Sequence, residues 1–288
     1  MKLSESKLEQ LLQTAIAAAK RAGAHIQSEA GKPREVISKE GHTPASQVVT
    51  EVDFESQRLI LETLADSMEK FGLGLLTEEA EDDDSRQRCD YFWCIDPIDG
   101  TLPFIENVAG YSVSIGLTSR AGEAVIGVVF DPVTGNLYHA SRGGGAFRNR
   151  EPIVLGDGGK LTLVIDRSMA LLENWESVRQ QMAAIAVELG LAGLKVINQG
   201  GAAMNACWVI ENAPAVYFKM PKPEHGGGAL WDFAATACLF AELGGGVVCD
   251  FDTAPLKLNR EGSPYMNREG VIFASSEALA AAVRGLSR

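Results

Sequence analysis

This 288-residue chain carries an acidic motif whose spacing suits the binding of a divalent cation. The motif, Asp96-Pro97-Ile98-Asp99-Gly100-Thr101, directly follows the apolar run Tyr91–Ile95. We expect that run to be a strand whose end places Asp96 at a sheet edge, with Pro97 fixing a turn that brings Asp96 and Asp99 together. Two carboxylates and the intervening Ile98 carbonyl are hard oxygen ligands, which suit Mg²⁺ or Mn²⁺ rather than zinc.

The same motif could also bind phosphate. Gly100 lets the backbone approach a ligand closely, and Pro103 fits the first turn of a helix that would begin near Thr101. The N–H groups at the start of a helix have no carbonyl partners within it and favour anions. An Asp-Pro turn that only caps this helix explains the isolated motif equally well.

A second acidic motif, Glu78-Glu79, follows the apolar run 73–76. The acidic stretch continues to Asp84, and most of it is typical of a solvated loop. We assign chemistry to Glu78, leave the role of Glu79 open, and assign none to residues 81–84.

Two further aspartates stand at expected helix starts. Asp232 follows Trp231 before a helix at 233–243, and Asp53 is the acidic member of a capping box that begins at Thr50. Both positions are common for residues that only cap a helix. Each motif is weak alone, so the hypothesis of a shared site rests on their combination.

In this order, the motifs resemble the pattern of the inositol monophosphatase superfamily of lithium-sensitive phosphatases. That pattern is an Asp after a Val-Thr pair, then Glu-Glu, then DP(I/L)DGT, then Trp-Asp before a helix. The matching segments are VVTEVD at 48–53, EE at 78–79, WCIDPIDGT at 93–101 and WD at 231–232, and weaker similarity covers nearly the whole chain.

The resemblance implies a layered α/β/α/β/α sandwich and hydrolysis of a phosphate monoester with two or three Mg²⁺ ions, for which Mn²⁺ could substitute. It implies metal ligands at Glu78, Asp96, the carbonyl of Ile98, Asp99 and Asp232. The implied catalytic residues are Asp53, Glu78 and Thr101, of which Asp53 and Thr101 would orient and deprotonate a metal-bound water. The backbone of Gly100 and Thr101 would hold the phosphate.

Substrate selectivity is expected between Gly200 and Asp232. Inositol monophosphatases have an acidic residue shortly before the Trp-Asp pair, whereas this chain has a longer stretch with basic residues at 219–228. Gly201 also stands where many relatives have Ser or Thr. The candidate substrate-binding residues are Gly100, Thr101, Gly200, Gly201, Ala202, Lys219, Lys222 and Asp232.

The two lysines leave the substrate open. Lys219 and Lys222 could bind a second phosphate, as in the related 3′(2′),5′-bisphosphate nucleotidases of the CysQ type, or they could be solvated lysines of a surface loop. Leu102 stands where those nucleotidases often have Lys, which argues the other way. Inositol monophosphate-like compounds and adenosine 3′,5′-bisphosphate therefore both remain candidates.

Hydrophobic periodicity divides the chain into two halves. The first half predicts a first helix with six residues on one face, a loop or hairpin over 31–47, a helix over 52–68, and strands at 91–95, 112–117, 124–130 and 137–140. The six residues of the first helix recur at three- and four-residue spacing and are Leu8, Leu11, Ala15, Ala19, Ala22 and Ile26. The second half alternates, with strands expected at 161–165, 194–197, 215–219, 247–250 and 271–274 and helices at 172–189, 202–212, 231–243 and 276–286. We expect an α+β part (1–155) followed by an α/β part (156–288), packed as one compact unit.

Composition narrows the classes of function. The formal net charge of −12 argues against binding a nucleic-acid polymer, although a bound cation can reverse the field near a small phosphorylated substrate. No stretch resembles a signal peptide and no apolar run reaches about 18 residues, so we expect no membrane span. The five cysteines form no CxxC pair, which fits reduced thiols in a cytoplasmic protein, and the four histidines show no ligand spacing.

Two other functions remain as hypotheses beside the phosphatase. One is a non-catalytic regulator that binds metal or phosphate with the same fold. The other is a structural calcium-binding protein, for which the chain lacks the spacing of an EF-hand. The resemblance also implies a homodimer.

Overall fold

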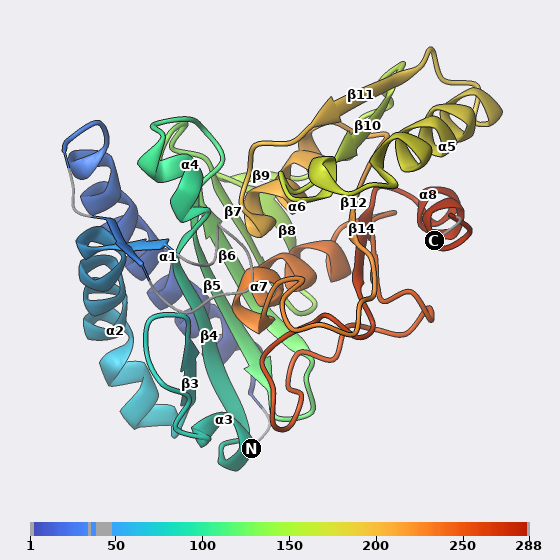
Figure 1. The fold of residues 1–288 in the computed structure, drawn as a ribbon. Coiled ribbons are helices and arrows are strands. Elements are labelled where there is room, and N and C mark those ends of the chain that lie inside the picture. The colour runs from blue at the N-terminus through green and yellow to red at the C-terminus, as the bar shows by residue number, and fades with distance from the viewer. Residues whose placement is uncertain (1–2, 34–35, 39–47, 287–288) are drawn as a thin grey trace.

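The strands of the computed structural model, which describes residues 3–33, 36–38 and 48–286, form two large sheets and one small one (Figure 1). The first large sheet has the order β3-β4-β5-β6-β7-β8-β9, with β3 and β4 parallel and the other neighbours antiparallel. Its strands are β3 (Gly74–Thr77), β4 (Tyr91–Asp99), β5 (Ser112–Ser119), β6 (Ala124–Phe130), β7 (Leu137–Ser141), β8 (Gly145–Arg148) and β9 (Glu151–Pro152).

The second large sheet has the order β11-β10-β12-β14-β13. Strand β10 is parallel to both β11 and β12, whereas β14 is antiparallel to β12 and β13. Its strands are β10 (Leu161–Val164), β11 (Leu194–Ile197), β12 (Ala215–Lys219), β13 (Val247–Cys249) and β14 (Val271–Ala274).

The helices and the small sheet complete the described chain. The helices are α1 (Glu5–Glu29), α2 (Glu51–Phe71), α3 (Ser85–Arg88), α4 (Thr101–Ile105), α5 (Trp175–Glu188), α6 (Ala202–Glu211), α7 (Leu230–Ala241) and α8 (Glu277–Arg284), with a 3₁₀ turn, η2, at Met169–Leu171. Strands β1 (Val36–Ser38) and β2 (Val48–Thr50) pair antiparallel, so part of the predicted 31–47 loop is a hairpin arm, while residues 39–47 lie outside the described residues.

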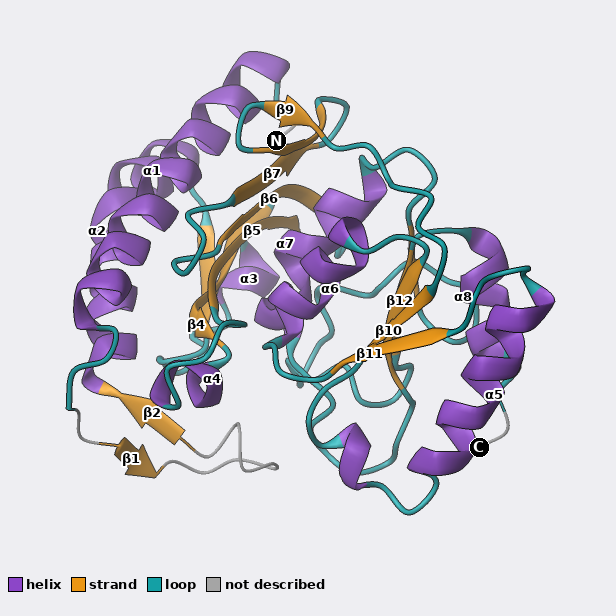
Figure 2. Cartoon of the chain, turned by 90° about the horizontal axis from the view of Figure 1, so that it is seen from above, coloured by secondary structure: helices purple, strands orange, loops and turns teal. Residues whose placement is uncertain are grey.

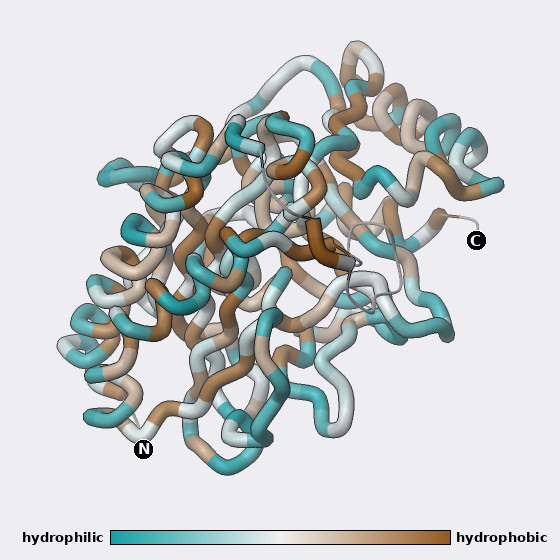
Figure 3. Tube along the Cα trace, turned by 60° about the vertical axis from the view of Figure 1, so that its left-hand side comes forward, coloured by the Kyte–Doolittle hydropathy of each residue, from teal (hydrophilic) through white to brown (hydrophobic). Residues whose placement is uncertain are grey.

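The layers follow the predicted α/β/α/β/α order (Figure 2). Helices α1 and α2 cover one face of the first sheet, α6 and α7 lie between the two sheets, and α5 and α8 cover the far face of the second sheet. Hydrophilic segments alternate with hydrophobic ones along α1 and α2, which matches helices with one face on a core (Figure 3). In α1 that buried face contains all six predicted residues, Leu8, Leu11, Ala15, Ala19, Ala22 and Ile26.

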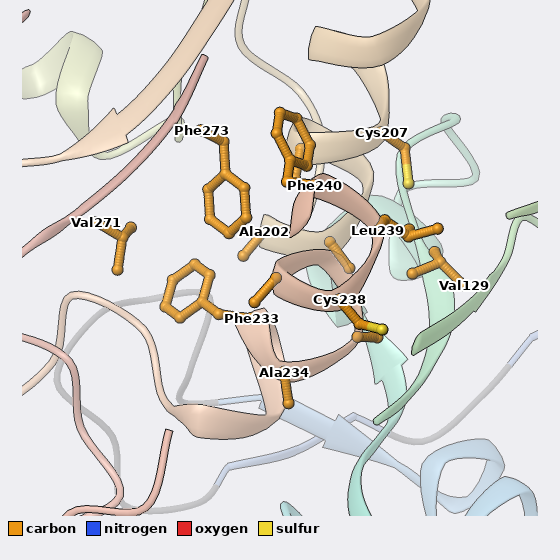
Figure 4. Close-up of a cluster of buried hydrophobic side chains, with 14 of the residues drawn as sticks. Val129, Ala202, Cys207, Phe233, Ala234, Cys238, Leu239, Phe240, Val271 and Phe273 are labelled. Atoms are coloured by element: carbon orange, nitrogen blue, oxygen red, sulfur yellow. The ribbon is translucent and has the colours of Figure 1, made fainter. Parts of the chain in front are cut away.

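Strand β4 shows why this sheet must be covered on both faces. Phe92 and Cys94 point into the core between the sheets, whereas Trp93 and Ile95 point toward α1 and α2. Successive side chains of a strand alternate between faces, so a strand that is apolar at every position requires a layer on each side. The core between the sheets collects residues of α6, α7, β6 and β14 (Figure 4).

Two glycines let α7 lie close to the first sheet. Gly116 of β5 and Gly127 of β6 are paired across the two strands. A Cβ on Gly127 would lie 2.0 Å from the Ala235 carbonyl oxygen, and one on Gly116 would lie 2.8 Å from the Ala234 Cβ. Because these two residues have no Cβ, α7 can pack close to the first sheet. The first turn of α7 carries Asp232.

Several predicted boundaries were wrong. The strand predicted at 91–95 continues to Asp99, because Asp96 pairs with Ser114 and Asp99 with Ser112 across a register shift, so the two aspartates lie within β4 rather than after it. The helix predicted at 172–189 begins at Trp175 after η2, and β3, β8, β9 and α3 were not predicted as elements. The first sheet ends at residue 152 and the second begins at 161. The division into 1–155 and 156–288 stays a proposal. Helix α7 from the second part packs on the first sheet.

Candidate metal and phosphate site

Three aspartates far apart in the sequence converge at one place. Asp96 and Asp99 come from β4, and Asp232 comes from the first turn of α7. One carboxylate oxygen of each lies within 4.8 Å of the others. Asp96 and Asp99 are buried, and Asp232 is partly buried. A buried set of carboxylate donors fits a hard divalent cation such as Mg²⁺ or Mn²⁺, because a single ion can neutralise several of these charges.

The electrostatics of this aspartate cluster (Asp96, Asp99 and Asp232) are unfavourable without a cation. Burial, with the negative charges of Glu78, Asp99 and Asp232, raises the pKa of Asp96 well above its usual range. Burial and Asp232 raise the pKa of Asp99 to about 8. Burial raises the pKa of Asp232 to about 6. Like charges held together in a buried site are stabilised either by protons or by a bound cation.

Glu78 faces the same region from the end of β3. Its backbone N–H donates to the Ile95 carbonyl (3.2 Å), which ties it to β4. Its charge contributes to the raised pKa values of Asp96, Asp232 and Asp53. Its neighbour Glu79 is held through its backbone, which is bonded at both N–H and C=O to the side chain of Gln57.

Asp53 is fixed by the predicted capping box at the start of α2. Its Oδ2 accepts hydrogen bonds from the Thr50 N–H (2.8 Å) and the Thr50 hydroxyl (2.6 Å). Its Oδ1 lies 3.2 Å from the Thr101 hydroxyl, which also lies 3.3 Å from the Ile98 carbonyl. Burial raises the pKa of Asp53 to about 6. The structure thus brings the predicted pair Asp53 and Thr101 into contact beside the predicted ligand Ile98.

Gly100 is the turn residue between β4 and α4. Its φ of +88° is in the region that favours glycine. A Cβ here would lie 2.8 Å from the Gly110 carbonyl oxygen and 3.1 Å from the Gly201 nitrogen. Pro103 lies in the first turn of α4, as predicted. The amino end of α4 is therefore held next to the aspartates and to the segment before α6.

The start of α6 contacts Asp99 directly. The N–H groups of Ala202 and Ala203 donate to the two oxygens of Asp99, at 2.9 and 2.8 Å. A Cβ on Gly201 would lie 2.5 Å from Asp99 Oδ2 and 2.6 Å from the Gly100 nitrogen. Of the predicted substrate-binding residues, Gly201 and Ala202 thus hold Asp99 in place, and the Ala202 N–H is engaged by that carboxylate. Gly200 contacts Asn205 and Trp208 of α6 instead, where a Cβ would lie 2.6 Å from each side chain.

The two predicted lysines have different surroundings. Lys219 ends β12, and its ammonium lies 2.9 Å from Asp166 Oδ2. Lys222 is half-buried in the following loop, where its N–H donates to the Asn267 carbonyl and the Asn267 side chain donates back to the Lys222 carbonyl. His139 contacts the Asn149 carbonyl and His225 packs against the Tyr265 ring, while His42 lies outside the described residues.

Sequence reasoning missed Asp166 and its neighbours. Asp166 Oδ1 accepts hydrogen bonds from the Tyr217 hydroxyl (2.9 Å) and the Asn205 amide (3.1 Å). The available signal was its position directly after the predicted strand 161–165, because polar residues at the carboxyl ends of parallel strands often line a site.

No helix among the described residues has the length and apolar character needed to cross a membrane.

Known proteins resemble this chain over most of its length. Nus factor SuhB of Vibrio cholerae is 29% identical over 272 residues, covering 92% of this chain and 91% of that protein. The 3′(2′),5′-bisphosphate nucleotidase CysQ of Aggregatibacter actinomycetemcomitans is 28% identical over 268 residues, covering 88% and 89%. The structure of inositol monophosphatase from Anabaena superimposes with a TM-score of 0.69 at 26% identity, covering 97% of each chain.

The match to a family model extends over nearly the whole chain. The model described as the inositol monophosphatase family matches residues 7–287. That range includes Asp53, Glu78, the aspartate cluster and all five layers of the fold. The chain therefore belongs to the inositol monophosphatase family.

Proposed function

We propose that the protein is a Mg²⁺-dependent, lithium-sensitive phosphatase that hydrolyses a phosphate monoester of a small molecule. The observation that carries this proposal is the convergence of Asp96, Asp99 and Asp232 within 4.8 Å beside the start of α4. The residues that would hold the metal are Glu78, Asp96, Asp99 and Asp232 with the carbonyl of Ile98. When bound, Mg²⁺ would lower the pKa of a water molecule and stabilise the charge of the phosphate.

The chain's own groups supply proton transfer and orientation. The pKa of Asp53, raised by burial to about 6, suits a carboxylate that accepts a proton near neutral pH. The Thr101 hydroxyl, which donates to Asp53, can in turn accept a hydrogen bond from the attacking water. The backbone N–H groups of Gly100 and Thr101 can bind phosphate oxygens at the amino end of α4. Attack by water requires no covalent phosphoenzyme.

The first test is phosphate release with the full-length protein. Asp96→Asn keeps an oxygen that can accept the Ile98 N–H (3.0 Å) but removes one negative charge from the cluster. We expect Mg²⁺-dependent release to fall by roughly 10²–10³-fold, the usual cost of losing a group that stabilises the transition state. We expect Li⁺ to inhibit the wild type. Equal release by wild type and variant across a panel of phosphate monoesters would refute the proposed enzyme.

The substrate class is decided by comparing two compounds. Inositol 1-phosphate carries hydroxyl groups beside the scissile phosphate, and adenosine 3′,5′-bisphosphate carries a second phosphate that Lys219 and Lys222 could bind. If adenosine 3′,5′-bisphosphate is the substrate, Lys222→Ala should raise the KM for this compound by roughly 10-fold, as for a lost hydrogen bond to a charged group. Its effect on an inositol monophosphate should be small, and an equal loss on both would reject the role of Lys222.

A regulatory role is the second candidate, because one relative of 29% identity is named a Nus factor. A protein that acts only as a regulator would release no phosphate from any compound of the panel, although it could still bind Mg²⁺. By resemblance to the family we also propose a homodimer, which analytical ultracentrifugation of the purified chain would test.

A further inference from the structure

An ion pair from the second sheet stands beside the aspartate cluster. Asp166 follows the carboxyl end of β10, and Lys219 lies at the carboxyl end of β12. Because β10 and β12 are parallel neighbours, both side chains belong to the same edge of the sheet. The Lys219 ammonium lies 2.9 Å from Asp166 Oδ2.

Buried partners hold this pair in one geometry. The Tyr217 hydroxyl and the Asn205 amide both donate to Asp166 Oδ1, and both of these residues are fully buried. The Lys219 and Asp166 side chains are only 16% and 22% exposed. The ammonium also lies 5.7 Å from the centre of the Phe233 ring, directly after Asp232 in the sequence. The lysine is therefore a fixed charge, unlike a solvated surface lysine.

The charge of Lys219 reaches two members of the aspartate cluster. Burial alone would lower the pKa of Lys219, but attraction to Asp166, Asp232 and Asp99 raises it overall. Two contacts tie the ion pair to the cluster: the ammonium lies beside the ring of Phe233, the neighbour of Asp232, and helix α6 bonds to Asp166 through Asn205 and to Asp99 through the Ala202 N–H. The geometry places a permanent positive charge next to carboxylates that would otherwise attract a divalent cation with their full charge.

We propose that Lys219 is a resident counter-cation that weakens divalent-cation binding by the aspartate cluster, and that Asp166 is a positioning residue that holds its ammonium away from Asp232 and Asp99. This inference rests on the metal site of the proposed function. Of the carboxylates that attract the ammonium, Asp232 and Asp99 would remain without the Asp166 charge, so Lys219 would compete directly with the metal. The two members of one ion pair should therefore affect metal affinity in opposite directions.

The experiment is calorimetric titration of the full-length protein with Mg²⁺ in the absence of any phosphate compound. Lys219→Gln should tighten Mg²⁺ binding roughly 3- to 10-fold, because it removes a nearby positive charge in a medium of reduced dielectric constant. Asp166→Asn should weaken binding by a similar factor. Lys219→Arg keeps the charge and should bind Mg²⁺ as the wild type does.

A control removes a positive charge from the same sheet at another place. Lys195 of β11 donates to Asn212 and is exposed, so Lys195→Gln should leave Mg²⁺ affinity unchanged. Weaker binding by both Lys219→Gln and Asp166→Asn would show that the pair only supports the fold, and would overturn the inference. If the wild type binds Mg²⁺ and neither variant changes its affinity, the inference also fails while the proposed function stands. Absence of Mg²⁺ binding by the wild type would instead refute the proposed metal site itself.

Discussion

Gly201 shows how one missing side chain shapes the site. It lies where the start of α6 meets both Asp99 and Gly100, and a Cβ there would come within 2.6 Å of each. The resemblance to the family implies Ser or Thr at this position, so a glycine first suggested altered substrate contacts. The structure gives a local reason, because this close approach allows the Ala202 and Ala203 N–H groups to bond to Asp99. Glycine here serves the placement of a carboxylate.

A substitution at Gly201 should show whether the close approach of α6 to Asp99 requires a residue without a Cβ. Gly201→Ala should lower the free energy of unfolding by about 1–3 kcal/mol, as for an overpacked site, and should weaken Mg²⁺ binding by displacing Asp99. Chemical denaturation and calorimetry would measure the two effects. Gly244→Ala is a suitable control, because nothing lies within 4 Å of a Cβ at Gly244. A variant Gly201→Ala as stable as the control would contradict this account.

At the scale of the elements, the position of α7 links the second part of the chain to the first sheet. The helix contacts β4, β5, β6 and β7, although it follows β12 in the sequence. The paired Gly116 and Gly127 allow this contact, and the first turn of α7 then reaches the end of β4. Asp232 accepts the Ala229 N–H (2.7 Å), so it is both a capping residue and a member of the aspartate cluster.

Enlarging one of these glycines should therefore affect a site that it does not touch. In Gly127→Ala the new Cβ would overlap the Ala235 carbonyl, so α7 must shift. We expect a loss of stability of about 1–3 kcal/mol together with weaker Mg²⁺ binding. Gly159→Ala is a matched control, because nothing lies within 4 Å of a Cβ at Gly159. Gly135→Ala is unsuitable, because the φ of Gly135 is +75°. Destabilisation of Gly127→Ala without any change in Mg²⁺ affinity would show that α7 does not position Asp232.

At the scale of the whole molecule, the buried carboxylates connect metal binding to stability. Asp53, Asp232 and Asp99 have pKa values of about 6, 6 and 8, all raised by burial above the usual 3.8. A raised pKa in the folded state means that folding favours the protonated form. The stabilisation from these protons is complete below the unfolded pKa and is lost as the pH rises through about 6 and then about 8. A bound cation would take the place of the protons.

The expected result is a pH dependence that Mg²⁺ removes. In a chelator, the contribution of these groups to the free energy of unfolding should fall between the unfolded pKa of 3.8 and the folded values of about 6 and about 8. In excess Mg²⁺ the fall should be smaller, so stabilisation by Mg²⁺ should grow with pH. Urea denaturation across this range would measure it. Asp232→Asn, which keeps an oxygen to accept the Ala229 N–H, should show a shallower fall in the chelator. Identical slopes with and without Mg²⁺ would contradict the link.

Local spacing was enough to predict much of this protein. The buried face of α1, the capping box at Thr50 and Asp53, the alternation of strands and helices after residue 160 and the order of layers all follow from periodicity, capping chemistry and the family motifs. The end of β4 did not, because Pro97 suggested a turn after Ile95. Pairing with β5 keeps the chain extended to Asp99, and such pairing depends on a strand that lies elsewhere in the sequence.

The sequence by itself therefore determined which residues have the chemistry for a metal and phosphate site, since carboxylates, a Thr hydroxyl and a glycine turn are properties of residue type and short-range spacing. The tertiary structure alone decided that Asp232 meets β4, that Gly201 makes room for Asp99, and that Lys219 is held by Asp166. Each of these contacts joins segments that are distant along the chain. Their geometry depends on how closely helices and sheets pack, and short-range spacing in the sequence does not predict that packing.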